Sequence, residues 1–142
     1  MSASLNLLSG EPFSVIVSGN PANTGRGTIR ANRLADGNLP PPARRPERWF
    51  DTVAFAVPPA FTFGTGGRNI IEGPANKVLD VSLIKDFRFT ERHRLEFRAE
   101  FFNFLNTAQF NIPGRVVSTA AFGMVTSADV PREIEFALRY RF

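Results

Sequence analysis

The chain has 142 residues, a formal net charge of +4 and no cysteine. This length suits one ordinary domain, and the lack of cysteine excludes disulfide frameworks, zinc–thiolate sites and cysteine nucleophiles. A basic balance can indicate nucleic acid or anionic lipid as a partner. Here, however, arginines alternate with glutamates inside predicted strands, so no cationic patch is evident. No apolar run approaches the roughly 18 residues of a membrane-spanning helix.

The N-terminal stretch predicts a strand. Residues 1–10 lack a basic segment followed by a continuous apolar core, so we expect no signal peptide there. From residue 4 to residue 17, apolar side chains recur at alternate positions, which is typical of a strand with one apolar face. Gly10-Glu11-Pro12 interrupts this alternation, and because proline cannot donate to a strand ladder, a bend is expected there. The prediction is one long bent strand over 4–17.

Residues 19–76 are predicted to form a long loop. They contain Gly-Asn-Pro, Asp-Gly-Asn, Pro-Pro-Pro, Pro-Pro and Gly-Thr-Gly-Gly, all of which are turn signals. Loops of this length are unusual in a compact soluble domain, whereas outer-membrane barrels carry long extracellular loops. Two apolar pieces, 49–57 and 61–63, are expected to be anchored segments or short strands within this loop.

Two clear strands are predicted next, over 77–89 and 92–104. In both, apolar side chains alternate with polar or charged ones, so each strand has an apolar and a polar face. The second strand sets Leu95, Phe97, Ala99 and Phe101 against Arg94, Glu96, Arg98 and Glu100. The short polar connection between the two strands predicts a tight hairpin. Residues 105–131, punctuated by Ile-Pro-Gly and Asp-Val-Pro, are predicted to form a second long loop.

The final stretch, 132–142, alternates most sharply. Its apolar face carries Ile134, Phe136, Leu138, Tyr140 and Phe142, and its charged face carries Glu133, Glu135, Arg139 and Arg141. A soluble antiparallel sheet with one face on a core produces the same pattern. A membrane-barrel strand needs about 9–11 such residues with aromatic residues at the interfaces, and this stretch meets both requirements. Its aromatic last residue favours the barrel.

The connections alternate long, short, long, which puts both long loops on one side of a barrel. This is the polarity of bacterial outer-membrane barrels. The lipid-facing row is then expected to comprise Leu95, Phe97, Phe101, Ile134, Phe136, Leu138 and Tyr140. The lumen-facing charged row is expected to comprise Arg94, Glu96, Arg98, Glu100, Glu133, Glu135, Arg139 and Arg141. Opposite charges on neighbouring strands would contribute about 0.2–1 kcal/mol per pair. A water-exposed sheet face explains the charged row equally well.

No enzyme chemistry is visible in the sequence, and we expect no cofactor or metal. The single histidine, His93, is predicted to be a solvated turn residue. No G-x-S-x-G, H-E-x-x-H or C-x-x-C motif occurs. The glycine-rich stretch at 64–67 lacks the Gly-Lys-Ser/Thr of a phosphate loop, so a plain turn is expected. The basic stretch 44–48 is expected to be a solvated loop, although nucleic-acid contact is an alternative.

Several motifs resemble the final segment of TonB-dependent outer-membrane receptors, specifically the Oar-like group. They are Pro-Glu-Arg-Trp-Phe-Asp-Thr at 46–52, Gly-Arg-Asn at 67–69, Gly-Pro at 73–74, Leu-Asp at 79–80, Thr-Glu-Arg at 90–92, Phe-Gly at 122–123, Thr-Ser at 126–127 and the stretch from Pro131 to Phe142. The most specific match is Phe-Arg-Ala-Glu-Phe-Phe-Asn-Phe-Leu-Asn-Thr at 97–107, followed by Phe-Asn at 110–111 and Pro-Gly at 113–114. The resemblance covers nearly the whole chain.

The resemblance implies an all-β, antiparallel, up-and-down fold supplying about the last four strands of a large barrel. Such receptors have a signal peptide, often a carboxypeptidase-regulatory-like domain, a plug and a barrel of about 22 strands. The first three have no counterpart here. Since the smallest single-chain barrels have about eight strands, four strands are expected to be part of a larger barrel. The implied location is the bacterial outer membrane, and the implied role is energised uptake of a substrate.

The implied partners are outer-membrane lipid, the barrel-assembly machinery, the rest of the barrel and plug, and the TonB system through that plug. Phe142 is expected to act as an assembly signal, with an interfacial girdle residue as the alternative. Two other functions stay open. One is a soluble β-sheet binding module whose apolar faces pack on residues 19–76. The other is a basic nucleic-acid-binding protein, which the acids set among the arginines disfavour, so we expect no nucleic-acid partner.

Overall fold

The computed structural model describes residues 1–25 and 27–142. The described chain is all-β, with two short 3-10 turns at Pro41–Ala43 and Thr52–Ala54, which confirms the predicted fold class. No helix in these residues is long and apolar enough to cross a membrane. The chain forms two compact units. Unit 1 contains Met1–Leu8, Asn76–Gln109 and Asp129–Phe142, and unit 2 contains Ser9–Ala75 and Phe110–Ala128.

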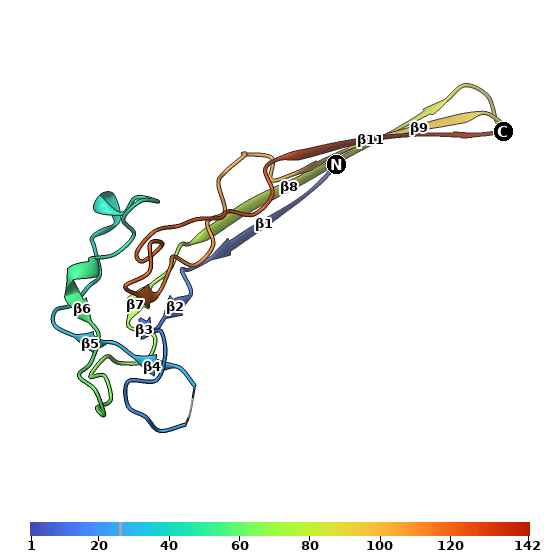
Figure 1. The fold of residues 1–142 in the computed structure, drawn as a ribbon. Coiled ribbons are helices and arrows are strands. Elements are labelled where there is room, and N and C mark those ends of the chain that lie inside the picture. Colours follow the sequence, from blue (N-terminus) through green and yellow to red (C-terminus); the bar gives the residue numbers. More distant parts are fainter. Residues whose placement is uncertain (26) are drawn as a thin grey trace. The chain divides into compact units, whose positions relative to one another are not determined.

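Unit 1 is built on one four-stranded antiparallel sheet. Its strands are β1 (Ser2–Leu8), β8 (Asn76–Arg88), β9 (Arg94–Phe102) and β11 (Glu133–Arg141). They lie in the order β1-β8-β9-β11, which follows the order of the chain (Figure 1). The last three coincide closely with the strands predicted over 77–89, 92–104 and 132–142. A tight turn joins β8 to β9, where Phe89 and Thr90 both donate backbone hydrogen bonds to the carbonyl of His93.

The register of the sheet aligns the apolar positions of all four strands. Leu95 lies opposite Tyr140 on one side and Phe87 on the other, while Ala99 lies opposite Phe136 and Leu83. On β8, Leu79 lies opposite Leu5 of β1. Directly opposed residues of an antiparallel pair point to the same face. One face of the sheet is therefore mainly apolar, with Lys85 opposite Phe97 as an exception, and the other is mainly polar, with Val78 and Ile84 as exceptions.

The strand predicted over 4–17 is wrong as a single element. β1 ends at Leu8, and the following residues form β2 (Pro12–Phe13) and β3 (Ile16–Val17) in unit 2. β2 pairs with β7 (Ile71–Glu72). At the break, a Cβ at Gly10 would lie 2.0 Å from the carbonyl oxygen of Gly73, so only glycine permits this close approach of the two backbones.

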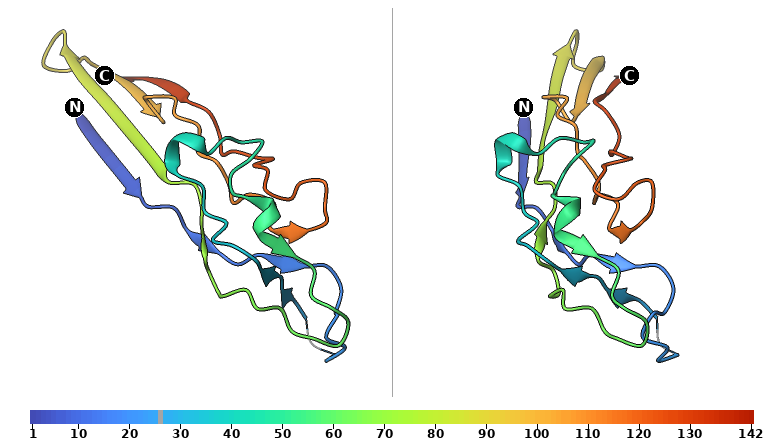
Figure 2. Two further views of the ribbon diagram at one scale, coloured as in Figure 1. Left: turned by 90° about the vertical axis from the view of Figure 1, so that its left-hand side faces the viewer. Right: turned by 60° about the vertical axis from the view of Figure 1, so that its left-hand side comes forward.

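β3 lies in the middle of a three-stranded sheet. It pairs antiparallel with β4 (Ile29–Arg30) and parallel with β10 (Val116–Val117). The remaining pair of unit 2 is β5 (Asn32–Arg33) with β6 (Phe55–Ala56). These strands are the small arrows of Figure 2. Each is two residues long, so packing must supply much of the order of unit 2.

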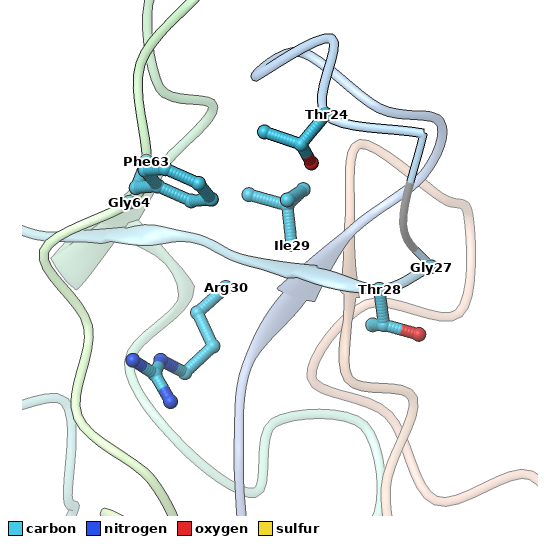
Figure 3. Close-up of a pocket in the computed structure, with 7 residues that line it drawn as sticks. All are labelled: Thr24, Gly27, Thr28, Ile29, Arg30, Phe63 and Gly64. Carbon is cyan, nitrogen blue, oxygen red and sulfur yellow. The ribbon is translucent and has the colours of Figure 1, made fainter.

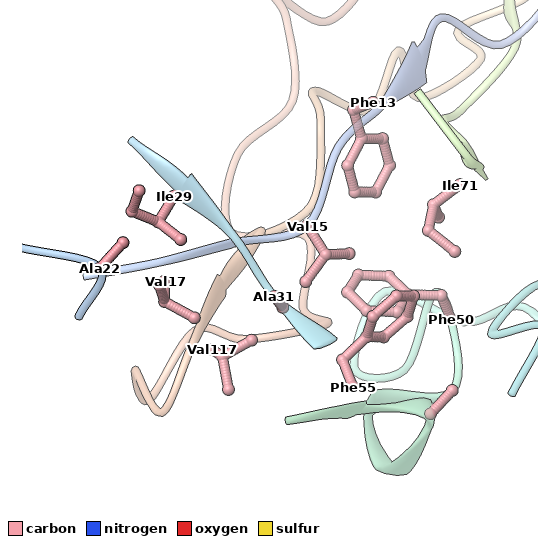
Figure 4. Close-up of a cluster of buried hydrophobic side chains, with 11 residues drawn as sticks. Phe13, Val15, Val17, Ala22, Ile29, Ala31, Phe50, Phe55, Ile71 and Val117 are labelled. Carbon is pink, nitrogen blue, oxygen red and sulfur yellow. The ribbon is translucent and has the colours of Figure 1, made fainter. Parts of the chain in front are cut away.

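The described residues of the predicted loop 19–76, which are 19–25 and 27–76, contain short strands and part of a packed core. Together with residues 9–18 and 110–128 they build a core of Phe13, Val15, Val17, Ala22, Ile29, Ala31, Phe50, Ala54, Phe55, Ile71 and Val117 (Figure 4). The ring of Phe50 meets those of Phe13, Phe55 and Phe122 edge-on, with centroids 5.8, 5.9 and 5.3 Å away. The apolar piece 49–57 is thus anchored, whereas Phe61 and Phe63 are 77% and 68% exposed. This core was not predicted from the sequence, because its residues come from short pieces that are separated by turn residues.

Candidate functional site

The apolar face of the unit 1 sheet is its most conspicuous surface. It carries Ala3, Leu5 and Leu7 on β1, Leu79, Val81, Leu83 and Phe87 on β8, Leu95, Phe97, Ala99 and Phe101 on β9, and Ile134, Phe136, Leu138 and Tyr140 on β11. Phe136 and Leu138 are each 68% exposed. A contiguous apolar surface spread over four strands marks an interaction site with lipid or protein.

Aromatic side chains gather where β11 ends beside the β8–β9 turn. The rings of Tyr140 and Phe142 stack with centroids 5.9 Å apart, and His93 stacks on Tyr140 at 5.8 Å. Tyr140 Oη also lies 2.6 Å from His93 Nδ1, which is hydrogen-bond distance. His93 is an exposed turn residue, as predicted, but it also ties β11 to the hairpin. No sequence pattern predicted this contact, because the two residues are 47 positions apart.

The opposite face of the sheet carries the charged row. Its charged residues are only partly paired with opposite charges on the neighbouring strand, whereas complementary pairs were expected. Arg139 lies opposite Glu96, as complementary pairing requires. Glu135, however, lies opposite Glu100, and Arg141 lies opposite Arg94. The ion pairs of the described unit 1 residues run instead along β9, from Arg98 to Glu96 at 3.6 Å and to Glu100 at 3.8 Å. The alternation of apolar residues and the turn determine the register of the strands. The charged residues therefore lie opposite whichever residues this register brings to them, including residues of like charge.

A buried polar node at the other end of β9 was missed by the sequence reasoning. Asn103 and Gln109 are only 6% and 5% exposed. Asn103 Oδ1 accepts the Thr107 backbone N–H at 3.1 Å, and its Nδ2 donates to the Thr107 carbonyl at 3.0 Å. Asn103 has φ of 50°, a left-handed conformation that asparagine tolerates better than most residues. These contacts close a compact turn directly after β9.

The polar node also joins the turn to the neighbouring strands. On β8, Asp80 Oδ1 accepts the Asn103 backbone N–H at 2.9 Å, and the Leu79 carbonyl accepts that of Phe104 at 2.7 Å. Just before β11, the Arg132 backbone N–H donates to Asn106 Oδ1 at 3.1 Å. The motif at 97–107 therefore ties together the three strands β8, β9 and β11, which is a sufficient structural reason for its residue types.

Unit 2 contains an open hollow of about 510 Å³ beside β4 (Figure 3). Thr24, Ile29 and Phe63 point toward one another there, while Arg30 leaves β4 on its other side. The loop that contributes Phe63 is held by the Phe61 backbone N–H, which donates to the Pro21 carbonyl at 2.6 Å. The lining is mostly apolar and lacks paired titratable groups, so it offers no catalytic arrangement.

The other stretches considered from sequence have structural roles in unit 2. A Cβ at Gly64 would lie 1.9 Å from the Arg30 carbonyl oxygen, so this glycine permits close backbone packing. In the basic stretch 44–48, Arg44 pairs with Glu72 at 2.7 Å and its guanidinium lies 6.0 Å from the Trp49 ring. Arg48 pairs with Asp51 at 3.0 Å. Within residues 1–25 and 27–142, no cluster of three or more His, Asp or Glu side chains could hold a metal ion.

A sheet with one continuous apolar face, one charged face and aromatics at its end is characteristic of a membrane β-barrel. The comparison with protein families agrees: residues 1–135 match the model of the outer membrane beta barrel domain. The chain therefore belongs to this family, and its location is the bacterial outer membrane. Neither the curated proteins nor the solved structures include a match to this chain.

Proposed function

We propose that the chain forms four strands in the barrel of a TonB-dependent transporter of the Oar-like group, which takes up a substrate across the outer membrane. The apolar face of β1, β8, β9 and β11 contacts lipid, and the charged face lines the lumen. The remaining barrel strands, the plug, the TonB system and the barrel-assembly machinery are the proposed partners. Substrate uptake itself is proposed on the resemblance of the motifs at 46–52 and 97–107.

The observation that carries the lipid-facing part of the proposal is the alignment of apolar positions across the sheet. β8, β9 and β11 have 13, 9 and 9 residues, and a strand of about 9–11 residues crosses the hydrocarbon core. Leu138 lies opposite Phe97, and Phe136 opposite Ala99, so β9 and β11 present one shared surface. A water-soluble sheet would need another layer on this surface, because exposed apolar patches of such extent promote aggregation.

The sheet also ends in two strands with free edges, β1 and β11. Backbone groups on an open edge are costly in lipid, since nothing there can replace their hydrogen bonds. Further strands on both edges would satisfy these groups, which supports membership of a larger barrel.

The lipid contact is tested by collisional quenching in the complete barrel that contains this chain, reconstituted into vesicles with brominated lipids. A fluorophore on a cysteine introduced at Phe136 should be strongly quenched, whereas the same probe at Glu135 should be spared. Equal quenching at both positions would overturn the assignment of the faces. A chain that is monodisperse and folded in buffer without detergent would instead favour the soluble binding module.

The transport role requires a second experiment on the complete protein in its outer membrane. Substrate accumulation should stop when the proton-motive force is collapsed or the TonB system is deleted, while the amount of barrel in the membrane stays unchanged. Uptake that continues in both conditions would reject energised transport and leave a passive barrel.

A further inference from the structure

Three arginines form a row across the charged face near the β8–β9 turn. Arg94 on β9 lies directly opposite Arg88 on β8 and Arg141 on β11. Directly opposed side chains have Cβ atoms about 4.5–5.5 Å apart, so the three guanidinium groups can reach a common point. Like charges in this arrangement destabilise a sheet, which makes an anionic partner favourable at this place.

The charges of this row are not balanced by ion pairs in the described residues. In unit 1 these pairs involve Arg98, which holds Glu96 and Glu100. Arg88, Arg94 and Arg141 are all exposed. The carboxylates nearest in register are those of Asp86 and Glu96, which lie opposite each other two residues along β8 and β9. Arg139 lies opposite Glu96 and belongs to that neighbouring row.

Two hollows adjoin Arg94. The larger, of about 360 Å³, lies at the turn and is lined by Arg88, Phe89, Thr90, Glu91 and Arg94. The smaller, of about 90 Å³, lies between the arginine row and the Asp86–Glu96 row. The larger hollow could hold a small anionic group beside two guanidiniums. Glu91 contributes the one carboxylate among its lining residues.

We propose that Arg88, Arg94 and Arg141 bind a phosphate group. Guanidinium forks match the oxygens of phosphate and form paired, charge-assisted hydrogen bonds with them. A phosphate monoester carries about two charges and three acceptor oxygens, so it can engage more than one arginine at once, whereas a carboxylate has two oxygens and one charge. The group belongs either to a phosphorylated solute on the aqueous side or to a lipid headgroup at the end of the sheet. The inference concerns the charged face alone and does not depend on substrate transport.

Arginine protection in the complete, unmodified barrel that contains this chain tests this proposal. Phenylglyoxal modifies accessible arginines, and mass spectrometry locates the products. Inorganic pyrophosphate should slow modification of Arg94 and Arg141 about tenfold while leaving Arg98, which is held by two carboxylates, unchanged. In a second arm, pyrophosphate is replaced by vesicles that contain phosphatidic acid, a lipid whose headgroup is a phosphate monoester. Protection by pyrophosphate identifies a soluble phosphate, and protection by vesicles alone identifies a headgroup. Equal modification of Arg94 and Arg98 in all conditions would overturn the proposal.

A variant pair adds an independent measurement of binding. Arg94→Gln should weaken pyrophosphate binding in titration calorimetry about tenfold, because it removes the central guanidinium of the row. Arg98→Gln on the same strand and face is the matched control and should leave the affinity within about twofold. Equal losses in the two variants would mean that the face attracts anions only through its general charge, which contradicts a site at the row.

Discussion

The side-chain amide of Gln109 pairs with the backbone of Lys77 as a neighbouring strand would. Gln109 Oε1 accepts the Lys77 N–H at 2.9 Å, and its Nε2 donates to the Lys77 carbonyl at 2.8 Å. The same Nε2 also donates to the Thr107 carbonyl at 3.0 Å. A single buried side chain thus extends the hydrogen-bond ladder near the start of β8 and fastens it to the turn after β9.

Replacing Gln109 by alanine should destabilise unit 1. The change leaves the Lys77 N–H without this partner, whereas the Lys77 carbonyl keeps the Thr107 hydroxyl as a donor at 2.7 Å. An unsatisfied backbone group costs about 1–3 kcal/mol. We expect a loss of about 1–3 kcal/mol in urea unfolding of the complete barrel that contains this chain. Asn6→Ala, on the exposed strand β1, is the control and should change stability by less than about 0.5 kcal/mol. A Gln109→Ala variant as stable as this control would show that the node is dispensable.

Substitutions on the two faces of β9 should differ in how much they destabilise the barrel. Phe97 stacks on Phe136 on the apolar face, with ring centroids 6.0 Å apart, so Phe97→Arg would put a charge into the proposed lipid contact. The expected cost is about 2–4 kcal/mol near the middle of the bilayer. Glu100→Leu, on the charged face, removes a carboxylate that faces Glu135 and should be mild. Heat-modifiable migration of the folded barrel on gels measures both variants, and equal tolerance would show that the faces are assigned wrongly.

Unit 2 should have a stability of its own that depends on Phe50. This side chain is fully buried and meets three other aromatic rings. Phe50→Ala should cost about 3–5 kcal/mol, as truncation of a buried phenylalanine does. Limited proteolysis should then cut within residues 9–75 while the unit 1 strands stay protected. Val53→Ala is the control, since Val53 is 78% exposed. Unchanged protease resistance in Phe50→Ala would contradict an independent core.

The role of Phe142 as an assembly signal stays a prediction. Phe142 is 92% exposed and stacks on Tyr140, which suits an interfacial girdle residue as well. As a girdle residue, its change to alanine should cost little, and the protein should still reach the outer membrane. As a signal, its deletion from the complete protein should leave the barrel unassembled in the periplasm and open to protease. Cell fractionation distinguishes the two, and a normal outer-membrane yield after deletion would reject the signal.

The sequence by itself determined the last three strands of unit 1 and their two faces. Strand side chains alternate, so the order of residues over 77–104 and 132–142 already assigns each position to one of two faces. In that part of the chain the local pattern and the sheet demand the same arrangement, and the family comparison agrees with the barrel that they predict.

Only the tertiary structure decided which residues meet across the chain. The register brought Arg94 between Arg88 and Arg141 and set Glu135 against Glu100, where complementary charges had been expected. It also paired His93 with Tyr140 and Gln109 with Lys77 over long separations. The core of unit 2 is collected from short pieces whose turn residues predicted a loop. Such contacts depend on distance in space, which alternation along the chain does not encode.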